Sequence, residues 1–206
     1  YTTDGSEPIA SSLKMGPENT IIGPAKLSAK SVGAHDKYNK VTLGDFKSGE
    51  TLPVVAKPKN VKPGGFKYSY YEGEWDKLPD FAKLKPIQLG ITDKNFDLNK
   101  LPHAINFACL VEGFVEIQKE GYYIFVLDSD DGSKLFIGNQ QLIDHDGLHS
   151  NGNAKTFMVP LSKGFYPVRI EFFQKGGGAN LEITYVVPGM NKPRPVSIPL
   201  ELQYSR

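Results

Sequence analysis

Short runs of β-favouring residues, punctuated by turn residues about every 10–12 positions, most limit what this 206-residue chain can fold into. The turns carry Asp131-Gly132, Gly138-Asn139 and Asp146-Gly147, pairs that favour tight β-turns. The run Tyr122–Leu127 is apolar on both faces, as expected of a central strand. The one stretch with helical character is short and covers residues 78–84. We therefore predict an all-β fold of antiparallel strands, a sandwich or a barrel.

Alternation of apolar and polar residues predicts the individual strands. Residues 105–111 and 114–117 alternate on either side of Gly113, which predicts a bulge or bend at that glycine. Similar patterns predict strands over residues 26–32, 134–137, 141–143, 156–161, 166–173 and 180–187.

Charge and cysteine content exclude several classes of protein. Lys and Arg number 24 against 23 Asp and Glu, without a basic run, so no footprint for nucleic acid or an anionic membrane exists. No apolar stretch approaches the ~20 residues of a membrane-spanning helix. The single cysteine, Cys109, excludes an intramolecular disulfide and a cysteine-cluster metal site. It shares a strand face with Phe107 and Val111, so we predict a buried, inert thiol.

A proline-rich stretch after residue 50 marks a domain boundary. Pro53, Pro58 and Pro63 disfavour a helix and a central strand alike. Near the end of the chain, alternating apolar residues from Ile198 to Tyr204 predict a final strand. We predict four parts: a first β domain over residues 1–50, a linker over 51–63, a second β domain over 64–189, and a tail with a final strand over 190–206.

Three carboxylates, Asp128, Asp130 and Asp131, follow the buried strand pattern within four positions. Neighbouring carboxylates repel one another unless a cation or several N–H donors meet them, and oxygen ligands of this kind suit Ca²⁺. The spacing does not fit a helix-loop-helix calcium loop, because Gly132 falls one place early. The alternative is a solvated hairpin whose carboxylates cap backbone amides.

A second polar cluster contains Asp144, His145, Asp146 and His149. Two histidines four apart would share a helix face as zinc ligands, but Gly147 and the strand context disfavour a helix, so the favoured interpretation is that both are surface residues.

The sequence carries few candidates for catalysis. It has neither a G-x-S-x-G elbow nor an H-E-x-x-H motif, so we identify no catalytic residue. Trp75 could stack on a sugar ring, or it could pack at the edge of the core.

Several motifs follow one another in a fixed order across the second domain. They are Tyr70-Tyr71-Glu72-Gly73-x-Trp75, Leu78-Pro79-Asp80-Phe81, Phe96-Asp97-Leu98, Gly121-Tyr122-Tyr123-x-Phe125, Ser129-Asp130-Asp131-Gly132-Ser133, Asp144-x-Asp146-Gly147-x-His149 and Arg169-Ile170-Glu171-x-Phe173-Gln174. This series resembles the protective-antigen-type β-barrel module, the "PA-fourteen" domain, whose members occur in glycosidases, adhesins and toxins and of which many bind carbohydrate.

The resemblance implies a site as well as a fold. In the sugar-binding adhesins, the aspartates that match Asp130 and Asp131 are joined by a cis peptide and hold a Ca²⁺ that chelates sugar hydroxyls. We therefore expect Asp130 and Asp131 to bind a glycan or Ca²⁺, with Asp128 as a further metal ligand and Asp144 and Asp146 in support. Trp75 and Gln174 complete the predicted carbohydrate site, since residues 174–180 are the candidate second loop. In other members the aspartate pair instead ties its turn to neighbouring strands.

The first segment has a resemblance of its own. Tyr1–Pro8 resembles the start of the immunoglobulin-like sandwich that follows the catalytic barrel in bacterial β-N-acetylhexosaminidases, which are family-twenty glycoside hydrolases. The implied fold is a truncated immunoglobulin-like β-sandwich followed by an antiparallel sandwich or barrel of the protective-antigen type. Because the chain opens inside a motif, we expect it to be a piece of a longer polypeptide.

These resemblances lead to two functional hypotheses. The first is a non-catalytic accessory region of a secreted, periplasmic or cell-surface glycoside hydrolase, which binds a glycan containing N-acetylhexosamine or galactose and adjoins an upstream catalytic domain. The second is a purely structural module that packs against the catalytic domain or a dimer partner.

Overall fold

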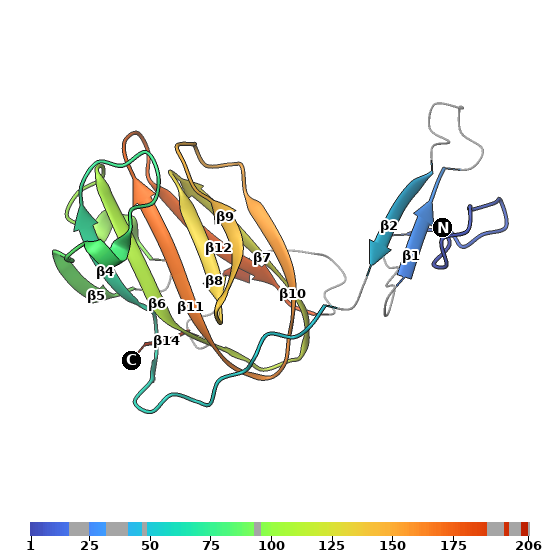
Figure 1. Ribbon diagram of the computed structural model, residues 1–206, viewed down its shortest axis with the longest axis horizontal. Coiled ribbons are helices and arrows are strands. Elements are labelled where there is room, and N and C mark those ends of the chain that lie inside the picture. The colour runs from blue at the N-terminus through green and yellow to red at the C-terminus, as the bar shows by residue number, and fades with distance from the viewer. Residues whose placement is uncertain are drawn as a thin grey trace. The chain divides into compact units, whose positions relative to one another are not determined.

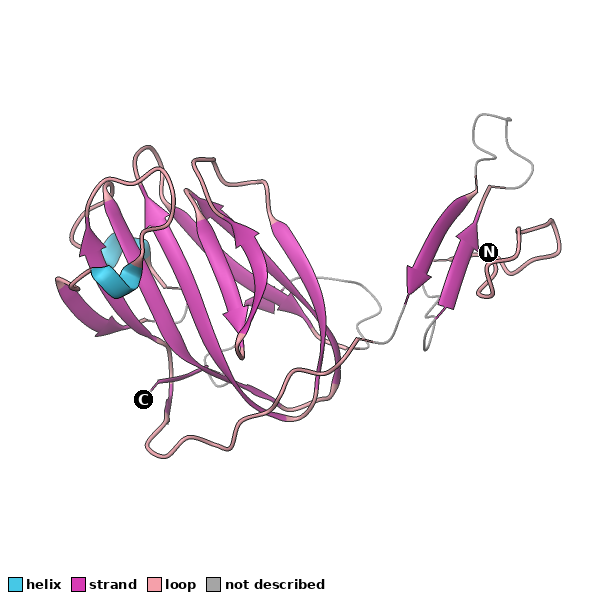
Figure 2. Cartoon of the chain, viewed as in Figure 1, coloured by secondary structure: helices cyan, strands magenta, loops and turns pink. Residues whose placement is uncertain are grey.

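The computed structural model describes residues 1–16, 25–31, 41–46, 49–92, 96–188, 196–197 and 203–205. The chain forms two compact units, Tyr1–Glu50 and Thr51–Arg206 (Figure 1). Strands are the main regular elements of both units, and the helical elements of the described residues are two 3₁₀ turns, η2 (Phe81–Lys83) and η3 (Leu98–Lys100) (Figure 2). The predicted all-β fold of antiparallel strands is confirmed. Within the described ranges, no helix is long and apolar enough to cross a membrane.

The first unit contains one antiparallel pair of strands, β1 (Ala25–Ala29) and β2 (Thr42–Phe46). The N-terminal segment joins it through a bridge between Thr2 and Ser28. The turn that follows Thr2 is closed by Asp4, whose Oδ1 accepts hydrogen bonds from the Ser6 backbone N–H and hydroxyl. The alternation over residues 26–32 therefore predicted β1 to within a few residues.

The second unit consists of two antiparallel sheets (Figure 1). The larger follows the order β3 (Lys62–Pro63), β14 (Gln203–Ser205), β6 (Phe107–Ile117), β11 (Gly164–Gln174), β8 (Ser133–Ile137) and β9 (Gln140–His145), with β4 (Lys67–Glu72) on β6 and β5 (Gln88–Ile91) on β4. The smaller follows the order β10 (Lys155–Leu161), β7 (Gly121–Asp130), β12 (Asn180–Val186) and β13 (Val196–Ser197).

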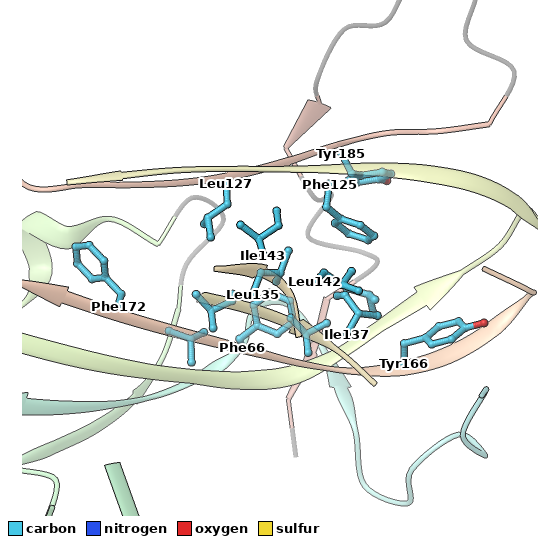
Figure 3. Close-up of a cluster of buried hydrophobic side chains, with 14 of the residues drawn as sticks. Phe66, Phe125, Leu127, Leu135, Ile137, Leu142, Ile143, Tyr166, Phe172 and Tyr185 are labelled. Atoms are coloured by element: carbon cyan, nitrogen blue, oxygen red, sulfur yellow. The ribbon is translucent and has the colours of Figure 1, made fainter. Parts of the chain in front are cut away.

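The core lies between these sheets. Along β7, every second residue from Tyr123 to Ser129 is buried, which is the period-two burial of a strand with one face on the core. Figure 3 shows Phe125 and Leu127 of the smaller sheet facing Leu135 and other buried side chains of the larger one. β7 is a central strand, between β10 and β12, as predicted.

Two details of β6 test the sequence analysis. The predicted bulge at Gly113 is absent from the described strand, because Gly113 pairs with Val168 in an unbroken register from Phe107 to Ile117. Gly113 pairs with β11 on one side, and on the other side it falls between the residues that pair with β4 and those that pair with β14. Cys109 is fully buried, and burial raises the pKa of its thiol, as expected of an inert cysteine.

Residues 51–63, the segment predicted as a linker, belong to the second compact unit and contact its core and β11. Leu52 contacts the core, and the Val55 N–H donates to the Phe165 carbonyl at 3.0 Å. The end of the predicted final strand is observed as β14, which pairs with β3. The other residues of that alternation, 198–202, lie outside the described residues.

Candidate functional site

The Asp130–Asp131 turn and the glycine-rich loop between β11 and β12, residues 174–180, lie side by side at one end of the second unit. β7 ends at Asp130 and β12 begins at Asn180, and these two residues are direct cross-strand partners. The peptide bond between Asp130 and Asp131 is cis. The fold therefore brings the predicted aspartate pair next to the predicted second loop, which precedes β12.

Asp131 is a buried carboxylate with two backbone donors, one on each oxygen. Its Oδ1 accepts from the His149 N–H at 3.2 Å, and its Oδ2 accepts from the Lys175 N–H at 2.9 Å. These donors lie 18 and 44 residues further along the chain. Asp131 thus ties the turn after β7 to two loops that the sequence keeps apart.

Asp130 and Asp128 lie on the opposite face of β7 from the core. Both oxygens of Asp128 accept from the Gly152 N–H, at 3.0 and 2.9 Å. Burial, helped by the adjacent charge of Asp131, raises the pKa of Asp130. Beneath the pair, the hydroxyls of Ser129 and Ser133 are 2.6 Å apart and brace the hairpin.

The resemblance also implies calcium, which needs several oxygen ligands around one point. Among the residues that the structure describes, no group of three or more His, Cys, Asp or Glu side chains is placed to hold a metal ion. The carboxylates of Asp128 and Asp131 are turned toward backbone N–H groups, so the three predicted ligands do not form a carboxylate cage.

Asp144 and Asp146 make ion pairs and hydrogen bonds that hold this end of the second unit together, and we call these supporting residues the frame of the site. Lys134 lies between them, with its Nζ 3.2 Å from Asp144 and 3.8 Å from Asp146. The Oδ1 of Asp146 also accepts from the Leu78 N–H at 2.8 Å. Asp146 therefore fixes the segment that follows β4.

The histidine pair departs from expectation. His145 is buried, so the prediction of two surface histidines is wrong for this residue. Its ring stacks on that of His149, with centroids 3.7 Å apart, and the His149 Nε2 lies 2.9 Å from the His145 carbonyl. Burial, with the proximity of His149, lowers the pKa of His145. His145 is buried because of the strand register, which makes it the cross-strand partner of the buried Ser133.

Trp75 is half-buried. It packs against a small cluster formed by Tyr71, Phe81, Ala108 and Phe173. Its ring also covers Gly73, where an added Cβ would come within 2.5 Å of it. This placement corresponds to the packing alternative.

Gln174 shapes the glycine-rich loop from below. The side chain is fully buried, and its Nε2 donates to the carbonyls of Gly176 at 2.7 Å and Gly178 at 3.0 Å. Gln174 thus replaces the side-chain contacts that a run of glycines cannot make.

A groove of about 900 Å³ opens beside this loop. One wall is formed by residues 177–181, and the other by residues 96–99 and 101–104, with Phe107 between them. Asn180 therefore belongs both to the groove and to the pair with Asp130. A smaller hollow of about 470 Å³ adjoins it at His103 and carries Glu72 and Glu74.

Sequence reasoning missed the wall formed by residues 96–104. Its one regular element is η3, where Asp97 caps the turn by accepting from the Asn99 N–H at 3.1 Å. The Phe96-Asp97-Leu98 motif was a signal, because Phe96 has a φ of 45° and packs against Tyr68 with ring centroids 5.8 Å apart. An aromatic residue fixed by packing at the start of a loop indicates that the loop has a defined position and can form one side of a groove.

Two packed antiparallel sheets with a loop cluster and a groove at one end define a β-sandwich module. Over residues 64–198 the sequence matches the family model of the PA14 domain. Because this match covers more than half of the chain, the chain belongs to the PA14 domain family.

Solved structures of low sequence identity share the fold. The PA14 domain of the MpAFP antifreeze protein superposes with a TM-score of 0.59 at 15% identity, over 75% of this chain and 96% of that one. A PA14 sugar-binding domain from an RTX adhesin gives 0.57 at 16%, over 70% and 100%. The epithelial adhesin 9 A domain from Candida glabrata, in complex with Galβ1-4GlcNAc, gives 0.57 at 12%, over 75% and 95%. No curated protein matches the sequence.

Proposed function

We propose that the second unit binds carbohydrate in the groove between residues 96–104 and 177–181. The observation that carries this proposal is the groove itself, which adjoins the cis Asp130–Asp131 pair through Asn180. Two of the similar structures, the RTX adhesin domain and the Candida glabrata adhesin domain, are described as sugar-binding or sugar-bound, which supports it.

The lining of the groove suits a neutral sugar. Phe96, Leu98 and Leu181 offer apolar surface for the C–H face of a pyranose, and Asn99 and Asn180 offer amide groups for its hydroxyls. Its ionisable side chains are Asp97 and His103, and the adjoining hollow adds two glutamates. A glycan that contains N-acetylhexosamine or galactose fits this chemistry better than an acidic one.

The resemblance implies calcium at Asp130, with Asp131 and Asp128 as further ligands, and binding would require these two carboxylates to turn from the backbone N–H groups from which they accept. When bound, the calcium ion would be coordinated by sugar hydroxyl oxygens. Burial and the adjacent charge of Asp131 raise the pKa of Asp130, and a cation bound beside Asp130 would offset that repulsion.

The test is a calorimetric titration of the chain with GlcNAc and with galactose, in Ca²⁺ and in EDTA. We expect a binding signal for at least one sugar, and its loss in Asp130→Asn if the aspartate serves the site. Asp144→Asn is the matched control, because it changes a carboxylate of the frame and should leave binding intact. A titration that gives no heat with either sugar contradicts the proposal.

We further propose that the chain is an accessory region of a larger enzyme, a secreted bacterial glycoside hydrolase of the β-N-acetylhexosaminidase type. The antiparallel β1–β2 pair and the Asp4-Gly5 turn support an immunoglobulin-like first unit. The chain alone should not hydrolyse an aryl N-acetylglucosaminide, whereas the parent polypeptide should, at the cell surface or in the periplasm. Hydrolysis by the chain alone contradicts this assignment.

A structural role is the second candidate, and strand β5 favours it. Ile87, Leu89 and Ile91 are 62, 71 and 57% exposed on one face of this strand, which pairs with β4 alone among the described strands. Exposed aliphatic residues on an edge strand mark a surface that another protein covers. If a catalytic domain or dimer partner covers it, Leu89→Lys should weaken that association and leave sugar binding unchanged. Met158→Lys, at a 53% exposed apolar residue on β10 of the other sheet, is the control for added charge.

A further inference from the structure

The loop between β9 and β10 donates backbone hydrogen bonds to the aspartates at the end of β7. The His149 N–H donates to Asp131 at 3.2 Å. Further along the same loop, the Gly152 N–H donates to both oxygens of Asp128, at 3.0 and 2.9 Å. These donors lie 18 and 24 residues beyond their acceptors, so the contacts are made by the fold and not by a local turn.

The third aspartate of the cluster is served by the same loop. A backbone hydrogen bond from Asn151 lowers the pKa of Asp130, against the larger opposing effects of burial and of Asp131. Gly152, the next residue, has a φ of 87°. A left-handed residue in this position lets consecutive N–H groups point to one side and form a concave site for anions. The loop therefore presents backbone N–H groups to all three carboxylates.

Backbone donors and a metal ion make opposite demands on these carboxylates. An N–H group directs the positive end of its dipole at the oxygen, so a cation beside the same oxygen would meet that positive end. Asp131 has a donor on each oxygen, the second being the Lys175 N–H at 2.9 Å, and both oxygens of Asp128 accept from Gly152. Because Ca²⁺ takes about six to eight oxygen ligands, these two aspartates could serve it only after they lose their hydrogen bonds.

We propose that the β9–β10 loop takes the place of a metal ion at this turn, so that the second unit folds and binds its ligand without calcium. Its N–H groups supply the partial positive charge that neighbouring carboxylates otherwise obtain from a cation. Loop and ion exclude each other, because they compete for the same carboxylate oxygens. This role goes beyond the proposed carbohydrate binding, which stays with the groove, and it departs from the calcium that the resemblance implies.

The first experiment compares the wild-type chain in EDTA and in millimolar Ca²⁺, by thermal unfolding and by calorimetric titration with CaCl₂. We expect the same unfolding temperature in both buffers and no heat of calcium binding. An ion that binds the folded state alone would raise the unfolding temperature. A calcium-dependent rise, or a heat of binding, therefore overturns the inference.

Asn151→Pro tests the loop itself, because proline lacks the N–H that Asn151 offers to Asp130. Asn151→Ala keeps that N–H and is the matched control for the loss of the side chain. In EDTA, Asn151→Pro should unfold about 2–4 °C below Asn151→Ala, the shift that one hydrogen bond gives in a unit of this size. Calcium should recover part of this loss, since the freed carboxylate can accept a cation. Equal unfolding temperatures of the two variants in EDTA contradict the role of the loop.

A second pair of variants covers the case in which proline prevents folding. Gly152→Ala keeps the N–H but strains the left-handed backbone that directs it at Asp128. Gly138→Ala is its matched control, because Gly138 also has a positive φ, 62°, in the hairpin between β8 and β9. At neither position would a Cβ meet a described atom within 4 Å. Gly152→Ala should unfold at the lower temperature, and equal losses count against the loop.

Sugar titrations in the same two buffers separate this role of the loop from the proposed function. If wild type binds GlcNAc or galactose equally well in EDTA and in Ca²⁺, both proposals are supported. If it binds a sugar only in Ca²⁺, the inference is overturned, while carbohydrate binding stands. If it binds neither sugar, carbohydrate binding falls, and the unfolding measurements still decide whether the loop replaces the ion.

Discussion

At the scale of single residues, Asp131 shows how one carboxylate can hold a loop cluster together. It is 6% exposed and accepts from backbone N–H groups of two other loops. We expect Asp131→Ala to lower the free energy of unfolding by about 2–4 kcal/mol, because both donors lose their acceptor. Denaturant unfolding measures this.

Asp131→Asn is the comparison for that variant. Its amide keeps one carbonyl acceptor, so about half of the loss should be recovered. Equal stability of wild type and Asp131→Ala would contradict the role assigned to this carboxylate.

His145 predicts a pH dependence of stability. Burial lowers its pKa in the folded state, so the unfolded chain binds the proton more readily. Its contribution to stability is therefore complete above the unfolded pKa of about 6.5 and is lost as the pH falls below that value. His145→Phe keeps a ring against His149 and should flatten this part of the profile. Thermal unfolding between pH 8 and pH 5 measures it, and an unchanged slope would rule out His145 as the source.

What the sequence could predict about the site differs from residue to residue. It drew attention to Asp130, Asp131 and Gln174, because a carboxylate cluster and a glycine run stand out locally, and their part in binding stays a prediction. It could not assign their partners, since the donors to Asp131 arrive from distant loops. Trp75 shows the same limit, because nothing local shows that Gly73 leaves room for its ring.

At the scale of elements, the approach to β4 depends on a pair of glycines. Gly64 and Gly65 both have positive φ values, 109° and 99°. A Cβ on Gly65 would lie 2.1 Å from the Thr92 carbonyl oxygen, whereas one on Gly64 meets nothing described within 4 Å. Gly65→Ala should therefore destabilise the fold by about 1–3 kcal/mol more than Gly64→Ala.

This pair isolates the steric effect, since both substitutions place alanine at positive φ. Chemical denaturation of the two variants gives the difference directly. Equal losses would show that backbone conformation alone, and not the approach of β5, requires glycine at position 65.

Strand prediction succeeded for the long strands of the second unit. β7, β11 and β12 were located to within two or three residues, because each is a run of β-favouring residues bounded by turn residues. The prediction at Gly113 was wrong, since a glycine that the sequence presents as a break lies within the continuous pairing of β6 with β11. The segment 51–63 was predicted as a linker from its prolines. Its observed contacts come from the side chain of Leu52 and the backbone of Val55 rather than from a continuous ladder, and the proline pattern does not indicate them.

At the scale of the whole molecule, the domain boundary can be tested by truncation. Residues 51–206 form one compact unit, and the family match begins at residue 64. A chain of residues 51–206 should fold by itself, whereas one of residues 64–206 should unfold at a lower temperature, because it loses the contacts of Leu52 and Val55. Circular dichroism melting of the two chains makes the comparison, and identical melting would return residues 51–63 to the status of a linker.

The glycine-rich loop has a consequence for how this module diversifies. Gly176 and Gly178 have ordinary backbone angles, and a Cβ at either position meets no described atom within 4 Å. Gly178 also lines the groove, while Gln174 anchors the loop through backbone carbonyls that any residue possesses. A single codon change at position 178 can therefore place a new side chain on the groove wall without disturbing its frame. Related sequences should vary most at this position, and directed evolution of new ligand preferences should begin there.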